Sequence, residues 1–172
     1  DANADTIEFI YKHRLITNSQ TILKSSGSGA ETLWDLRVKP SSDGASSSFE
    51  FRLNNSQRAD SDIGERGFSM SLAYNNMSDG QLWNVMLQRM TSSVSGSGVN
   101  EYRLHSSLQD NTSILNYTYV TMSVSGGIAV DGNHIANQNF ISSGSRHQLS
   151  SSNLVVGEVF SGSLSEIKAW SS

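Results

Sequence analysis

Apolar and polar side chains alternate along most of this chain. In Thr6–Lys12, for example, Ile7, Phe9 and Tyr11 fall on one face. Such runs are short and separated by Gly, Ser, Asn and Asp clusters, which is typical of an all-β sandwich or barrel. The predicted strands are Thr6–Lys12, Thr21–Lys24, Trp34–Val38, Phe49–Leu53, Gly67–Tyr74, Leu82–Met90, Glu101–Leu104, Thr118–Val124, Ile128–Val130, Leu154–Val156 and Leu164–Trp170. So many short strands in one domain require two packed sheets, with little or no helix.

The clearest antiparallel hairpin joins Trp34–Val38 to Phe49–Leu53. The segment between them contains Pro40, Asp43 and Gly44, which are typical turn residues. Pro40 lies at the strand end, where its missing N–H breaks no ladder hydrogen bond. The sequence therefore predicts that these two strands pair directly.

A chain of 172 residues suits one domain with a substantial core. Its Gly/Ser-rich loops are only a handful of residues each, so they are interpreted as turns and not as interdomain linkers. The prediction is one β-sandwich domain over residues 1–172. Because the chain starts at Asp1 and not at Met, we expect a processed product or a fragment of a larger protein.

Composition excludes several partners. Twelve Lys and Arg face 16 Asp and Glu, for a net charge of −4, and no basic cluster occurs, so nucleic acid is not an expected partner. The chain has no cysteine, so it has neither disulfides nor a thiolate metal site. No apolar run approaches the roughly 20 residues of a membrane helix, so no membrane insertion is expected.

Four segments resemble, in chain order, the strands of laminin-G-like domains. Asp5–Lys12 and Ser19–Ser25 are similar to the family's first two strands, and Leu82–Arg89 is similar to its W-x-x-V-x-x-x-R strand. Leu154–Trp170 is similar to its closing L-x-I-G … F-x-G-x-I-D-E-V-R-I-W segment. The resemblance implies a concanavalin A-like jelly roll of two antiparallel sheets, with the termini close together and the first and last strands adjacent.

The middle of the chain departs from that family pattern. The stretch from Ser92 to Val130 is longer than the family's usual return, and both Glu101–Gln109 and Ile128–Val130 are candidates for its strand. The order of strands is therefore open here. This chain is rich in serine and has no cysteine. In this respect it is similar to the versions of the module found in bacteriophage structural proteins and bacterial surface proteins.

No catalytic residue is predicted. Concanavalin A-like glycosidases place paired carboxylates on one strand as E-x-D-x-x-E, and the nearest acidic cluster here, Asp60–Glu65, lies in a polar stretch between strands. There is no G-x-S-x-G elbow for nucleophilic catalysis. The histidines lack the close spacing of a zinc site: His13, His105, His134 and His147. The expectation is that the chain is not an enzyme, with glycosidase activity as a minor alternative.

Calcium is the one cofactor that the sequence suggests. It needs six to eight oxygen ligands, which loops rich in Asp, Asn and carbonyl groups can supply. The candidate ligands are Asp60, Asp62, Glu65, Asp110 and Asp131. The alternative is that these are ordinary turn residues.

Aromatic side chains could form a sugar-binding surface, since Tyr and Trp rings stack on sugars while Asn binds hydroxyl groups. The alternating pattern around Trp34, Trp83 and Trp170 indicates core packing instead. The best candidate glycan site is Tyr117 and Tyr119, flanked by Asn111 and Asn116.

Two functions from different classes follow. The first is a non-catalytic structural or adhesive module of an extracellular or virion assembly, with other subunits or further copies of itself as partners. Edge strands on a weakly charged surface would be its route of association. The alternative is a carbohydrate-binding domain, with or without calcium. Either function predicts an extracellular or virion-surface location.

Overall fold

The fold is built from β-strands. The computed structural model describes residues 4–26, 32–42, 46–53, 68–91, 99–110, 112–125 and 153–171. The strands in these ranges are β1 (Ala4–Lys12), β2 (Gln20–Ser26), β3 (Thr32–Pro40), β4 (Ser47–Leu53), β5 (Phe68–Ser71), β6 (Trp83–Thr91), β7 (Val99–Gln109), β8 (Ile114–Ser125), β9 (Asn153–Val156) and β10 (Ser163–Ser171). In this part of the chain, no helix is long and apolar enough to cross a membrane.

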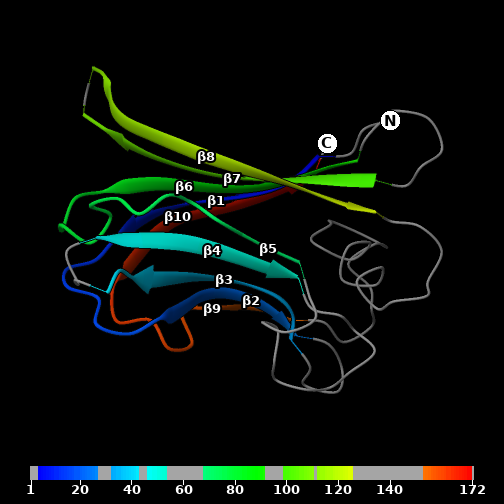
Figure 1. The fold of residues 1–172 in the computed structure, drawn as a ribbon, viewed down its shortest axis with the longest axis horizontal. Coiled ribbons are helices and arrows are strands. Elements are labelled where there is room, and N and C mark those ends of the chain that lie inside the picture. The colour runs from blue at the N-terminus through cyan, green and yellow to red at the C-terminus, as the bar shows by residue number, and fades with distance from the viewer. Residues whose placement is uncertain are drawn as a thin grey trace.

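The strands form two antiparallel sheets that pack face to face (Figure 1). One sheet has the order β10-β1-β6-β7-β8, and the other has the order β5-β4-β3-β2-β9. The predicted all-β, two-sheet jelly-roll sandwich is confirmed. The first and last strands are paired as expected, with Asp5 opposite Ser171, so these two strand ends lie side by side.

The structure contains the predicted hairpin, and it shows how the middle of the chain is paired. β3 pairs with β4 in the expected hairpin, with Trp34 opposite Leu53 and Val38 opposite Phe49. In the middle of the chain, β7 extends to Gln109 and pairs with β8. The other candidate for that strand, 128–130, lies outside the described residues.

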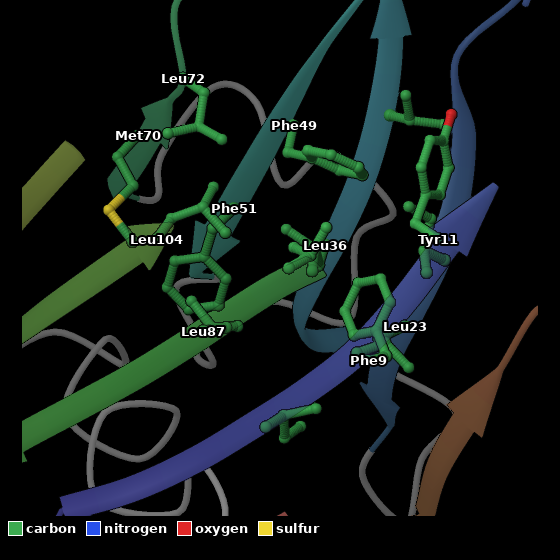
Figure 2. Close-up of a cluster of buried hydrophobic side chains, with 14 of the residues drawn as sticks. Phe9, Tyr11, Leu23, Leu36, Phe49, Phe51, Met70, Leu72, Leu87 and Leu104 are labelled. Atoms are coloured by element: carbon green, nitrogen blue, oxygen red, sulfur yellow. The ribbon is translucent and has the colours of Figure 1, made fainter. Parts of the chain in front are cut away.

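The core lies between the sheets because alternate residues of each strand face inward. Figure 2 shows Phe9, Leu87 and Leu104 of the first sheet meeting Leu36 and Phe51 of the second. Trp34 and Trp83 are also buried, as predicted from their strands. Full burial of a Phe or Leu side chain stabilises the fold by about 1.5–3 kcal/mol relative to leaving that side chain exposed.

The outer face of the second sheet carries a ladder of ion pairs. The guanidinium of Arg52 donates from Nε to Oδ1 of Asp35 at 2.7 Å, and both residues occupy opposite positions on β3 and β4. Two residues further along the same face, Glu50 accepts hydrogen bonds from Arg37 and from Lys39, the latter at 3.2 Å. These buried or half-buried charges stabilise one another, and they give this face a structural role.

Candidate functional site on the outer face of the first sheet

The first sheet presents a different outer face. The strand pairing aligns Glu8 of β1, Met86 of β6, His105 of β7 and Tyr119 of β8 in one row across the sheet. Their chain neighbours point into the core, because successive side chains of a strand alternate between faces. Aromatic, amide and imidazole groups therefore line this face, in contrast to the ion-pair ladder of the second sheet.

Three rings from β7 and β8 form a cluster on this face. The imidazole of His105 has its centroid 5.9 Å from each of the rings of Tyr117 and Tyr119, and the two tyrosine rings are 5.8 Å apart. Tyr117 is 52% exposed and Tyr119 is 62% exposed. Large aromatic side chains are usually buried. Two neighbouring exposed tyrosines on one face of a sheet therefore form a surface on which a ligand can stack.

The central contact of this cluster is a hydrogen bond between His105 and Tyr117. The phenol oxygen of Tyr117 lies 2.7 Å from Nδ1 of His105. The other ring nitrogen, Nε2, is buried and has no hydrogen-bond partner among the described residues. With the ring hydrogen on Nε2, the phenol donates to Nδ1, and a proton can pass between the two groups.

Burial lowers the pKa of His105, and the positive charge of Arg103 lowers it further. Arg103 lies on the same face of β7, two residues before His105. The imidazole is therefore neutral at neutral pH, which is the form that can accept a proton. The site thus holds an unprotonated imidazole in contact with a phenol.

The polar groups around the cluster are paired with one another. Nε of Arg103 donates to Glu101 at 2.6 Å. The amide of Asn84, on β6, donates to Glu8 at 2.6 Å. Two carboxylates of this face are therefore engaged by neighbouring side chains.

The predicted glycan-site residues separate in the structure. Tyr117 and Tyr119 lie together on the outer face, as described above. Asn116 lies opposite Leu108 on the core-facing side of β8, since it immediately precedes Tyr117 in the strand. Asn111 lies outside the described residues.

Of the candidate calcium ligands, only Asp110 is described; Asp60, Asp62, Glu65 and Asp131 lie outside the described residues. Oδ1 of Asp110 accepts hydrogen bonds from the backbone N–H groups of Thr112, at 2.8 Å, and Ser113, at 2.7 Å. These bonds lower the pKa of Asp110 and stabilise the β7–β8 turn. Within the described ranges, no group of three or more His, Cys, Asp or Glu residues could hold a metal ion.

Sequence reasoning missed His105 as a member of the cluster. One predicted strand, Glu101–Leu104, ended before His105, whereas the candidate strand Glu101–Gln109 contained it, and β7 does continue to Gln109. The signal that could have found it is the hairpin itself. Asp110, Thr112 and Ser113 form a turn that marks a hairpin, so the segment before Asp110 pairs with the segment that holds the two tyrosines; a register irregularity between Leu108 and Gln109 then brings His105 opposite Tyr119.

No family model and no curated protein matches the chain. Among solved structures, the alginate lyase from Klebsiella pneumoniae is similar over 98% of this chain and 59% of its own, with a TM-score of 0.46 and 8% identity. The alginate lyase from Alteromonas sp. 272 is similar over 70% of this chain and 51% of its own, with a TM-score of 0.37 and 13% identity. The chain thus spans little more than half the length of either enzyme.

These comparisons correct one prediction. Both similar structures are enzymes, so the expectation of a non-catalytic structural or adhesive module, and of a chain that is not an enzyme, is contradicted. At these identities and TM-scores, neither the substrate nor the catalytic residues of the two lyases carry over to this chain.

Proposed function

We propose that this chain is a polysaccharide-cleaving enzyme whose site is the cluster of His105, Tyr117 and Tyr119. The observation that carries the proposal is the 2.7 Å hydrogen bond between Nδ1 of His105 and the exposed phenol of Tyr117. It joins a neutral base to an acid on a surface that a sugar can reach. The neighbouring ring of Tyr119 supplies a face on which a pyranose can stack.

The chemistry of this pair suits β-elimination. The phenol oxygen of Tyr117 takes a proton from the sugar carbon next to a carboxylate while its own proton passes to His105. The electron pair left on the carbon forms a C=C bond, and the glycosidic C–O bond breaks. The proton held by His105 then returns through Tyr117 to the leaving oxygen.

The charges around the pair support this cycle. Burial of the ring, and in addition the charge of Arg103, disfavour the charged imidazolium, so a protonated His105 readily releases its proton. Elimination requires a carboxylate beside the carbon that loses its proton, so the proposed substrate class is a polysaccharide that contains uronic acids.

Hydrolysis is the less favoured reaction. Glycoside hydrolysis usually uses two carboxyl groups about 5–10 Å apart as acid and as base or nucleophile. On this face, Glu8 is bound to Asn84 and Glu101 is bound to Arg103. The minor alternative of a glycosidase therefore finds no support in the described part of the face.

Mass spectrometry of the products tests the proposal. The protein is incubated with a panel of soluble uronic acid polysaccharides, and with the same polymers after chemical reduction of their carboxyl groups. We expect oligosaccharides with an unsaturated end, one water lighter than hydrolysis products, from the acidic polymers only. Products of hydrolytic mass, or no products from any acidic polymer, would overturn it.

Several expectations from the sequence stay proposals beside this one. They are the finer relationship of the jelly roll to laminin-G-like domains of the concanavalin A-like superfamily, an extracellular or virion-surface location, and a single domain that belongs to a larger protein. Calcium bound by Asp60, Asp62, Glu65, Asp110 or Asp131 also stays a prediction. None of these is needed for the proposed reaction.

A further inference from the structure

Among the described strands, four lie at the edges of the two sheets, β5, β8, β9 and β10, and they differ in how they are protected. An exposed edge presents unpaired N–H and C=O groups to other chains, and proteins protect edges by shortness, charge, proline or bulges. β5 and β9 have four residues each. β10 has a register irregularity where it pairs with β1, and it carries Glu166 at φ 50° with an ion pair to Lys168. Three edges thus have a recognisable protection.

β8, the fourth edge strand, has none of these features. It is 12 residues long and contains no charged residue and no proline between Ile114 and Ser125. Within the described part of the chain its one strand partner is β7, and it borders the molecule along the top of Figure 1. A long, uncharged edge of this kind favours pairing with another strand.

The side chains of β8 are also typical of a strand that has another strand on each side, because several large apolar ones are exposed or only partly buried. Ile114, Leu115 and the two site tyrosines are exposed. On the core-facing side, Val120 and Met122 pack against the core but are only partly buried. Another strand beside β8 would cover the exposed parts of Val120 and Met122 and extend the core past the present edge, while the two tyrosine rings stay on the outer face of the sheet.

We propose that β8 pairs with β8 of a second copy of this chain, antiparallel about a two-fold axis. The strand is self-complementary in this arrangement. Each copy presents the same outward N–H and C=O groups to the other, and β8 carries no charged side chain that would repel its counterpart. Aromatic and threonine side chains, such as Tyr119 and Thr121, become cross-strand neighbours, and such pairs stabilise sheets. The two five-stranded sheets join into one sheet of ten strands.

This dimer does not depend on the proposed enzymatic activity, but it has a consequence for the site. A two-fold axis perpendicular to the sheet keeps both outer faces on the same side. The clusters around His105 of the two copies then lie on one continuous surface, next to the shared edge. One long polymer could contact both.

Light scattering coupled to gel filtration tests the dimer. Ser123 lies on β8 opposite Glu101 of β7, so Ser123→Lys gains an opposite charge within its own chain while it introduces a charge at the edge. We expect the wild-type mass to rise from that of one chain to that of two as concentration increases, and the Ser123→Lys mass to stay at one. The matched control is Ser165→Lys on the protected β10 edge, which should dimerise as the wild type does.

Thr121→Asp is the second variant if Ser123→Lys does not fold. It places a carboxylate opposite Arg103, again a favourable pair within the chain, and it should also give a monomer. Circular dichroism establishes that each variant is folded. A wild type that stays at the mass of one chain over the whole concentration range would overturn the proposal. A dimer that both β8 variants retain would overturn it as well.

Discussion

The phenol oxygen of Tyr117 lies 2.7 Å from Nδ1 of His105, although twelve residues separate them in the chain. The contact is a diagonal one, because His105 stands directly opposite Tyr119 while Tyr117 stands opposite Ser107. A shift of the β7–β8 register by one residue would turn both tyrosines to the core-facing side. The site therefore depends on the hairpin register, which the hydrogen-bonded turn at Asp110 and the irregularity between Leu108 and Gln109 set together.

Tyr119 is expected to bind the sugar without moving a proton. Tyr119→Ala removes the exposed ring that lies 5.8 Å from Tyr117, so it should raise KM with little change in kcat. A lost stacking contact of about 1 kcal/mol corresponds to roughly a fivefold change. Steady-state kinetics on a cleaved polysaccharide measures the effect. Tyr119→Phe keeps the ring and should behave as the wild type; a large fall in kcat with either variant would argue against this role.

The pKa of His105 should respond to Arg103. Burial is the larger cause of its lowered pKa, and the charge of Arg103 adds to it. Arg103→Gln should therefore raise the pKa of His105 toward its ordinary value of about 6.5, as followed by NMR titration of the imidazole. Because the neutral ring is the active form and is present above its pKa, the acid limb of the activity profile should move to higher pH. Lys168→Gln, on β10, is the control; an unchanged His105 titration in Arg103→Gln would refute the electrostatic account.

Glu50 should contribute to stability in a pH-dependent manner. Burial by itself would raise the pKa of Glu50, but its hydrogen bonds and ion pairs with Arg37 and Lys39 together hold the pKa below its ordinary value. The stabilisation is therefore complete above the unfolded-state pKa of about 4.3, and it is lost as the pH falls through the lower folded-state pKa.

Denaturant unfolding at a series of pH values measures this dependence. Glu50→Gln should lower the free energy of unfolding at neutral pH and flatten its decline in acid. Glu166→Gln removes an exposed carboxylate that pairs with Lys168, and a surface pair of this kind is worth about 0–1 kcal/mol. An equal loss in the two variants would contradict the assignment of a structural role to the buried ladder.

The core should be most sensitive where rings of the two sheets meet. Phe51 of β4 is fully buried, and its ring centroid lies 5.2 Å from that of Tyr102 on β7. Phe51→Ala should lower the free energy of unfolding by about 3–5 kcal/mol. Tyr74, which is 52% exposed, provides the control, since Tyr74→Ala should change it by no more than about 0.5 kcal/mol. A loss below about 1 kcal/mol for Phe51→Ala would mean that the sheets do not pack as described.

The strand pattern made much of the fold predictable. Alternation around Trp34 and Phe49 specified both the hairpin and the buried face, because a half-buried strand must alternate to cover the core. The pairing of β1 with β10 was predictable from the resemblance and not from alternation, since the pattern of a single strand does not identify its partner. Tyr74 shows the limit of the pattern: it continues the alternation of Gly67–Tyr74, yet β5 ends at Ser71 and Tyr74 is exposed.

Half of the candidate site was predictable. Tyr117 and Tyr119 share a face because they are two residues apart in a strand, whereas Asn116 was selected for its closeness in sequence and lies on the other face. The contact with His105 depends on a turn and on a register irregularity between Leu108 and Gln109. Such an irregularity is set by how two strands fit together, so the sequence of one strand does not reveal it.

Removal of one oxygen atom tests the central claim most directly. Tyr117→Phe keeps the ring beside His105 but removes the hydroxyl that passes the proton. On a uronic acid polysaccharide that the wild type cleaves to unsaturated products, kcat should fall roughly 100-fold or more while KM stays close to the wild-type value. Tyr74→Phe, which removes a hydroxyl from an exposed tyrosine outside the cluster, should leave both constants unchanged. A Tyr117→Phe enzyme as fast as the wild type would contradict the proposed role of the pair.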